Sequence, residues 1–346
     1  MADERYPMVS IIMPIRNEAD YIGRAIQSIL DNDYPNDKLE IIVADGCSTD
    51  GTQNVVQKIS KQDIRVCLIN NPGKIVPTAM NIGIKASKGE ILIRVDGHAE
   101  IFPDFIKNSV ICLENHPEVW CAGGVMETIG STYIGNVIAA AMSCPVGVGG
   151  GNFRLGTKEG YVDSVPFGAH RRWVFDKVGM FDEELVRNQD DEFILRMVEA
   201  GGKQYMSPNI RSRYFSRSSF RKLARQYFQY GFWRIRTIQK RGKPASFRQM
   251  IPLFFVLGWF FLFLTSPFWV SMRYVLVSYA LIYLFVILLG VFDVGRKKGW
   301  KIAALVPVAF IIMHTSYGLG TLKGIWSWII LKGKKVSRPE SHGMSR

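Results

Sequence analysis

The first hundred residues alternate short apolar runs with segments of helical spacing. Four runs rich in β-branched residues predict strands: residues 8–15, 39–46, 64–70 and 90–96. Three segments between them have apolar residues three and four positions apart and predict helices: residues 20–30, 48–60 and 75–87. Strands that alternate with helices in this way predict an α/β fold, with a parallel sheet covered by helices on both faces.

Polar residues follow the predicted strands, where parallel α/β sheets bind their ligands. These candidate site residues are Pro14, Asn17, Glu18, Asp45, Asp50, Asp96 and His98. Acidic residues at three strand ends of one sheet indicate a site rather than ordinary loop polarity. The sequence has no GxxxxGK[ST] loop and no GxGxxG after the first strand, and we interpret the glycine-rich residues 147–156 as a mobile loop.

The second half of the chain contains three long apolar segments. Ile251–Val270 and Tyr274–Phe292 carry no charge, and Ile302–Leu322 contains only His314 as a titratable group. A helix needs about 20 apolar residues to cross a bilayer core. The sequence therefore predicts about three transmembrane helices.

Charge divides the chain into parts. Residues 1–202 carry 19 Lys/Arg and 28 Asp/Glu, residues 203–248 carry 13 and none, and residues 249–346 carry 11 and 2. We predict four regions: an α/β domain (1–210), basic amphipathic interface helices (211–248), transmembrane helices (249–331) and a basic tail (332–346).

The distribution of basic residues predicts an orientation in the membrane. The N-terminus has no apolar signal segment, and residues 203–248 and 296–301 are both basic, so we expect these regions and the α/β domain on the cytoplasmic side. The localisation expected is a multi-pass protein of the cell (inner) membrane. Three spans would place the basic residues 332–335 outside, unless a break at Gly318–Gly320 turns the third segment back.

Residues 217–243 interleave basic and aromatic side chains, as in an amphipathic helix at a membrane surface. Nucleic acid is the rival partner for such a segment. Because a predicted span begins within ten residues of Lys243, membrane lipids or a polyprenyl diphosphate are the nearer polyanions, and no nucleic acid partner is expected.

Four motifs in order, "VSIIMPIRNEADYI", "IIVADGCSTDGT", "GEILIRVDGH" and "NQDDEFILRM", resemble the family 2 glycosyltransferases of the GT-A fold over residues 8–235. The segment "QYFQYGFWRIR" and the apolar runs ending "HTSYGLGTLKG" resemble the membrane-anchored exopolysaccharide type, such as the succinoglycan chain glucosyltransferases. The resemblance implies inverting transfer of a hexose from a UDP-sugar to a hydroxyl of a polyprenyl-diphosphate-linked glycan.

The resemblance assigns metal and nucleoside contacts to the strand ends. Asp96 opens the metal-binding DxD-type motif, whose third position is His98 here, and the pair would hold Mn²⁺ or Mg²⁺ against the donor diphosphate. The alternative for His98 is a solvent-exposed turn residue. Asp45 would accept the N3–H of uracil, and Pro14, Asn17 and Glu18 would line the base and ribose. Asp50 would cap the following helix and support its loop.

An inverting transfer to a hydroxyl needs a carboxylate base opposite the leaving group. Alignment with the family pattern places this base at Asp190, with Gln189 where glutamate is usual. If the alignment is offset by one residue, the base is Asp191. An acidic first helical turn, stabilised by the helix dipole, is the structural alternative for these side chains.

Two further groups are candidates for the acceptor and its phosphates. Arg171 and Arg172 precede the base motif. Gln229, Trp233 and Arg234 resemble part of the QxxRW motif of processive synthases, but Phe232 stands where the arginine belongs, so we expect no polymer-secreting channel.

Two other functions remain open from the sequence. An enzyme of the same fold could glycosylate a polyprenyl monophosphate directly, and this anionic acceptor needs no base. A catalytically silent membrane scaffold that binds nucleotide-sugar or lipid belongs to a different class.

Overall fold

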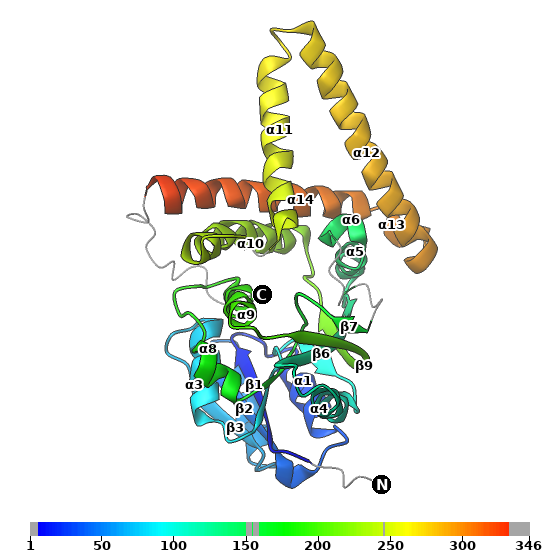
Figure 1. Ribbon diagram of the computed structural model, residues 1–346. Helices are drawn as coiled ribbons and strands as arrows, with labels where there is room; N and C mark the ends of the chain where they lie inside the picture. Colours follow the sequence, from blue (N-terminus) through cyan, green and yellow to red (C-terminus); the bar gives the residue numbers. More distant parts are fainter. Residues whose placement is uncertain (1–5, 150–153, 155–158, 245, 332–346) are drawn as a thin grey trace. The chain divides into compact units, whose positions relative to one another are not determined.

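The computed structural model describes residues 6–149, 154, 159–244 and 246–331 (Figure 1). The chain forms two compact units. The α/β unit comprises residues 6–127 and 159–214, and the helical unit comprises residues 128–149 and 215–331. Residues 128–149 thus cluster with the helical unit, whereas the prediction gave all of residues 1–210 to the α/β domain. The basic tail and most of the glycine-rich loop lie outside the described residues.

The predicted parallel strands are confirmed. They are β1 (Val9–Ile15), β2 (Leu39–Asp45), β3 (Val66–Asn70) and β4 (Ile91–Arg94). All seven residues of β1 are buried, as expected for a central strand covered on both faces. Ile15 lies opposite Asp45, and Asp45 opposite Asn70, so the carboxyl ends of β1, β2 and β3 are level.

The remaining strands make the sheet mixed rather than parallel. They are β5 (Ala99–Ile101), β6 (Cys121–Ile129), β7 (Gly160–Tyr161), β8 (Ala169–Arg171) and β9 (Gln204–Phe215). Within the described residues the sheet has nine strands in the order β3-β2-β1-β4-β8-β6-β9-β5, with β7 paired to β9. Strand β8 runs antiparallel to both β4 and β6.

Helices cover the sheet on both sides (Figure 1). They are α1 (Ile22–Leu30), α2 (Thr52–Ser60), α3 (Val76–Ala86), α4 (Phe105–Asn115), α8 (Trp173–Val178) and α9 (Gln189–Glu199), with a short 3₁₀ turn at Asn36–Lys38. One core cluster joins Ile12 and Leu92 of the sheet to α3, α8 and α9 through Met80, Phe175 and Phe193. This packing fixes α9 against the sheet.

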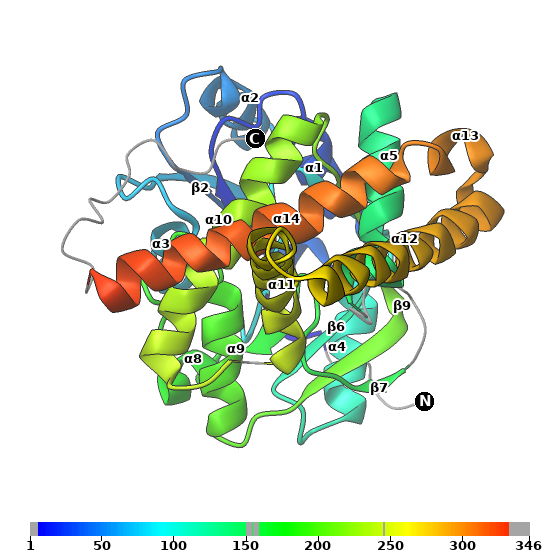
Figure 2. The same ribbon diagram turned by 90° about the horizontal axis from the view of Figure 1, so that it is seen from above.

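The helical unit contains two helices long and apolar enough to cross a membrane, Phe247–Thr265 and Val270–Lys298. Its elements are α5 (Tyr133–Met142), α6 (Pro145–Val148), α10 (Phe220–Arg241), a 3₁₀ turn (Phe247–Met250), α11 (Ile251–Thr265), α12 (Val270–Lys298), α13 (Trp300–Ala303), α14 (Val306–Gly324) and a π-helical end (Ile325–Ile330). Figures 1 and 2 show α10 and α14 lying crosswise to α11. The first two predicted spans therefore correspond to apolar helices.

The third predicted span falls in two helices of the helical unit. Residues 302–322 fall in α13 and α14, and α14 is not among the described helices that qualify as a span. It packs against α10 and α11 through glycines: a Cβ on Gly318 would lie 2.3 Å from the Pro252 carbonyl oxygen, and one on Gly320 would lie 2.1 Å from that of Phe228. Gly318 and Gly320 sit inside a continuous helix, so the predicted break is wrong, and they permit close helix packing instead.

Candidate active site

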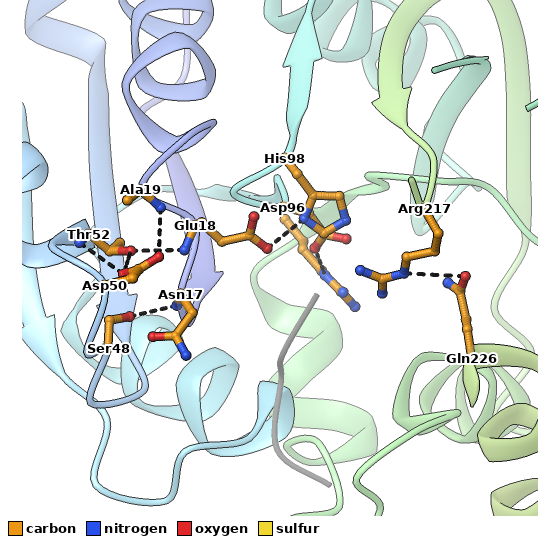
Figure 3. Close-up of polar contacts among 11 residues, drawn as sticks. Asn17, Glu18, Ala19, Ser48, Asp50, Thr52, Asp96, His98, Arg217 and Gln226 are labelled. Atoms are coloured by element: carbon orange, nitrogen blue, oxygen red, sulfur yellow. Dashed lines mark hydrogen bonds and ion pairs between the residues drawn. The ribbon is translucent and has the colours of Figure 1, made fainter. Parts of the chain in front are cut away.

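The loop after β1 is fastened to the loop after β2 by hydrogen bonds (Figure 3). The backbone N–H of Asn17 donates to Ser48 Oγ over 2.8 Å, and the Asn17 side-chain oxygen accepts from the Thr49 N–H over 2.9 Å. The backbone N–H of Glu18 donates to Thr52 Oγ1 over 2.8 Å. The two loops predicted to surround the nucleoside therefore form one hydrogen-bonded body.

Asp50 stabilises these two linked loops through hydrogen bonds to their backbone. Its carboxylate accepts from the backbone N–H groups of Ala19 and Thr52, each over 3.1 Å. Burial raises the pKa of Asp50, but the hydrogen bonds from Thr52 and Ala19 outweigh burial and lower the pKa below its usual value. The N-cap of α2 is Gly51, which makes no side-chain cap hydrogen bond, and Asp50, the predicted cap, accepts from the N–H of Thr52, the first residue of the helix.

Asp45 is almost fully enclosed, with 1% of its surface exposed. Its Oδ1 accepts from Ser48 Oγ over 2.5 Å, and its Oδ2 accepts from the Ser48 N–H over 2.9 Å and from Gln53 Nε2 over 2.5 Å. A carboxylate has about four acceptor positions, so these donors occupy most of them. An N–H group of a base would use the remaining position or replace one of these donors.

Asp96 lies just beyond β4 and is held by an arginine on the same strand. Arg94 Nε donates to Asp96 Oδ1 over 2.8 Å. Burial raises the pKa of Asp96, but attraction to Arg94 first, then to His98 and Arg187, lowers it below the ordinary value. The described residues offer no hydrogen bond to Oδ2, and the side chain is 19% exposed. The Asp96 carboxylate is thus ionised and partly exposed.

His98 faces Glu18 across the start of the β4–β5 connection (Figure 3). Its Nδ1 lies 2.8 Å from Glu18 Oε1, and its ring meets the ring of Tyr214 edge-on at 5.0 Å. The His98 side chain is only 11% exposed, so it is not the solvent-exposed turn residue of the alternative interpretation. Glu18, predicted to line the base and ribose, directs its carboxylate at His98.

Asp96 and His98 fit a divalent cation that arrives with its own phosphate ligands. No group of three or more His, Cys, Asp or Glu side chains within the described part of the chain is arranged to hold an ion. Mg²⁺ and its relatives are commonly held by one or two protein ligands together with water and substrate phosphates. The carboxylate of Asp96 and the imidazole of His98 match this donor set.

The predicted base lies at the start of α9. Asp190 is exposed, Asp191 is half-buried, and Glu192 is buried and pairs with Arg196 over 2.9 Å. Arg187, which precedes α9, contributes to the lowered pKa of Asp96, after the larger effects of Arg94 and His98. The approach of Asp190 to a donor sugar held at Asp96 stays a prediction.

Left-handed backbone conformations mark this edge. Five described residues other than glycine have positive φ angles, and four of them are Asn17, Cys47, Lys74 and Asn188, which follow β1, β2 and β3 or immediately precede α9. Such conformations are costly for residues with a side chain and cluster at functional sites. The sequence signals these positions only weakly, through the two asparagines.

Arg171 and Arg172 are not part of this site. Arg171 pairs with Ile91, the first residue of β4, and therefore lies at the amino end of that strand. Its guanidinium donates to the carbonyls of Val119 and Leu113 over 2.9 and 2.6 Å, and Arg172 donates to Ser87 Oγ over 2.7 Å. The two arginines line a separate cavity of about 330 Å³. The predicted contact with acceptor phosphates is wrong for this geometry, because β8 runs antiparallel to β4.

Arg171→Gln is expected to destabilise the protein by about 1–3 kcal/mol, because the buried carbonyls that it satisfies lose their donors. The KM for the acceptor should not change. Chemical denaturation and steady-state kinetics check the two results, with Arg213→Gln as a control at a half-exposed site. A stable variant with a raised acceptor KM would restore the phosphate role.

Gln229, Trp233 and Arg234 are buried within the helical unit, with 5, 3 and 6% of their surfaces exposed. Arg234 Nε donates to the Tyr317 hydroxyl of α14 over 3.3 Å. The Trp233 ring lies 5.5 Å from the ring of Trp328. These contacts give the residues a packing role, and their contact with an acceptor stays a prediction.

Comparisons with known proteins show what this chain is similar to. Residues 10–145 match the family described as Glycosyl transferase family 2. A dolichyl N-acetyl-α-D-glucosaminyl phosphate 3-β-D-2,3-diacetamido-2,3-dideoxy-β-D-glucuronosyltransferase of Methanococcus voltae is 26% identical, covering 92% of this chain and 97% of the relative. The succinoglycan biosynthesis protein ExoA of Rhizobium meliloti is 28% identical, covering 70% of this chain and 74% of the relative.

A solved structure shares the fold. The mannosyltransferase PcManGT of Pyrobaculum calidifontis, determined in complex with GDP-Man and Mn²⁺, superposes with a TM-score of 0.62 at 18% identity, covering 94% of this chain and 88% of that one. The family match and the shared fold agree with the carboxylates at the strand ends. This chain contains a family 2 glycosyltransferase domain of the GT-A fold.

Proposed function

We propose that the protein transfers a hexose from a UDP-sugar, with inversion at the anomeric carbon, to a hydroxyl of a polyprenyl-linked glycan. The observation that supports the proposal is the presence in the α/β unit of two carboxylates with different surroundings. Asp96 is ionised beside Arg94 just after β4, and Asp190 is exposed in the first turn of α9. An inverting transfer needs both an anchor for the leaving group and a separate base.

Each carboxylate has a distinct part in this proposal. When bound, a divalent cation held by Asp96 and His98 would neutralise the charge that grows on the leaving diphosphate. Asp190 takes the proton of the acceptor hydroxyl as it attacks, which its exposure permits. The N-terminus of α9 favours the ionised form that can act as a base.

The nucleoside half of the donor would bind at Asp45 and Asn17. The enclosure of Asp45 by donors leaves one acceptor position for the N3–H of uracil. The Mn²⁺ of the mannosyltransferase structure supports a divalent cofactor, either Mn²⁺ or Mg²⁺. The GDP-Man in the same structure makes GDP-sugars the necessary comparison in any test.

The helical unit and the relatives support a lipid-linked acceptor. Helices α11 and α12 have the length and apolarity of membrane spans. One relative is named for a dolichyl-phosphate-linked sugar and another for succinoglycan biosynthesis. Arg221, Lys222 and Arg225 are exposed on α10, where they would meet anionic headgroups. We place the protein in the cytoplasmic membrane, with the α/β unit on the cytoplasmic side.

A donor and acceptor panel tests the proposal. The purified full-length protein, in lipid nanodiscs with Mn²⁺, is incubated with UDP- and GDP-hexoses and with acceptors that are polyprenyl monophosphate, or glycans linked through a mono- or diphosphate. Mass spectrometry should detect one added hexose on a linked glycan with a UDP-sugar donor. Product on the bare monophosphate alone would favour direct phosphate glycosylation. The absence of both transfer and donor hydrolysis would favour the silent scaffold.

A further inference from the structure

Glu18 and His98 form a buried contact between the segments that follow the adjacent strands β1 and β4. Nδ1 of His98 lies 2.8 Å from Oε1 of Glu18, and the two side chains are 11% and 9% exposed. The sequence resemblance predicts a nucleoside contact for Glu18 and a metal contact for His98. The structure connects the two residues.

This contact selects one tautomer of the imidazole. An ionised carboxylate can only accept a hydrogen bond, so Nδ1 of His98 carries the hydrogen and donates it. In a neutral ring, the lone pair is then on Nε2. Histidines that bind metals commonly donate their other ring N–H to a carboxylate or carbonyl, which fixes the ring and strengthens the ligand.

Glu18 is itself held in place by its neighbours. Its backbone N–H donates to Thr52 Oγ1, which in turn donates to Asp50 (Figure 3). Its side chain packs over Gly97, where an added Cβ would lie 3.1 Å from Glu18 Cγ and 2.9 Å from Ile15 Cγ2. The glycine of the Asp-Gly-His sequence thus leaves the space through which Glu18 reaches His98.

We propose that Glu18 is a positioning residue that fixes the ring and tautomer of His98, so that Nε2 is the nitrogen presented to the divalent cation. The proposal rests on the metal site of the proposed function. In this proposal Glu18 contacts His98 instead of the nucleoside. The orientation of His98 then depends on the loop that Asp50 stabilises.

A double-mutant cycle on cation binding tests this proposal without measuring turnover. Mn²⁺ affinity is measured by calorimetry in the presence of UDP for the parent, Glu18→Ala, His98→Ala and the double variant. Loss of the outer carboxylate should weaken Mn²⁺ binding about 10-fold in the parent background. In the His98→Ala background, the same change should have no further effect.

Two matched variants separate positioning from folding. Glu18→Gln keeps the size and an oxygen acceptor, and should bind Mn²⁺ with an affinity between those of the parent and Glu18→Ala. Glu100→Ala removes a carboxylate two positions after His98, 4.0 Å from Arg24, and should not change the affinity. The ¹⁵N shifts of the His98 ring should show the Nε2 lone pair in the metal-free parent and mixed tautomers in Glu18→Ala.

The outcomes distinguish this inference from the proposed function. Equal losses from Glu18→Ala in both backgrounds, or weakened UDP binding without metal, would overturn positioning and restore a nucleoside role. If Asp96→Asn weakens Mn²⁺ binding but His98→Ala does not, His98 is not a ligand, and only the inference fails. If neither variant weakens binding, the metal site of the proposed function fails as well.

Discussion

Asp190→Asn is expected to lower kcat for transfer to a polyprenyl-linked glycan about 1000-fold, because an amide cannot take the proton of the acceptor hydroxyl. The side chain is exposed at the start of α9, so the fold should tolerate the substitution. Mn²⁺ and donor binding should be retained, because Asp190 acts on the acceptor. Steady-state kinetics at saturating donor, with calorimetry for binding, checks both parts.

Asp191→Asn is the matched control, one residue along the same turn. Asp191 is half-buried, and its variant should keep most of the activity. The opposite pattern, with Asp191→Asn inactive and Asp190→Asn active, would show that the base lies one residue further along. Full activity of both variants on a polyprenyl monophosphate would support direct glycosylation of the phosphate, which needs no base.

Asp96→Asn is expected to reduce kcat/KM about 100- to 1000-fold, because the charge on the leaving diphosphate loses its stabilising partner. The neutral amide is a poorer ligand for a hard cation, and it leaves Arg94 without the carboxylate that accepts its Nε hydrogen bond. Mn²⁺ titrations of activity and of binding should both shift to higher concentrations.

The chain offers a close control for this variant. Asp63 and Arg65 form another Asp–Arg pair two residues apart, with Arg65 Nε donating to Asp63 Oδ1 over 3.0 Å ahead of β3. The pKa of Asp63 is also lowered, chiefly by the hydrogen bond from Arg65. Asp63→Asn should leave Mn²⁺ dependence unchanged. An Asp96→Asn enzyme with the parent's metal dependence would remove Asp96 from the metal site.

The parallel half of the sheet could be predicted because its strands are buried on both faces and appear as continuous apolar runs. The antiparallel half could not. Strands β7 and β8 are two and three residues long, too short to show a period, and nothing in the sequence tells in which direction they run. The antiparallel direction of β8 places Arg171 at the amino end of β4, away from the predicted site.

The site divides in a similar way. Asp45 and Asp96 could be found because they end strands whose alignment is fixed by the sheet. The contacts of Arg94 with Asp96, of Gln53 with Asp45 and of Glu18 with His98 depend on side-chain conformation and loop packing, which no sequence periodicity records. In the helical unit, apolar content alone suggested a span over 302–322. The glycine contacts of α14 with α10 and α11 are visible only once the helices are assembled.

Residues 128–149 belong to the helical unit although they lie between two parts of the α/β unit in the sequence. This has a practical consequence for the preparation of a water-soluble enzyme. Helices α5 and α6 bury apolar side chains, including Val137, Ile138 and Met142, and they pack against α12, α13 and α14. Truncation after β9 would remove those partners. The apolar side chains of α5 and α6, in the middle of the remaining sequence, would then be exposed to water and promote aggregation. A water-soluble enzyme would require a short polar bridge in place of residues 128–149 as well as removal of everything beyond 215.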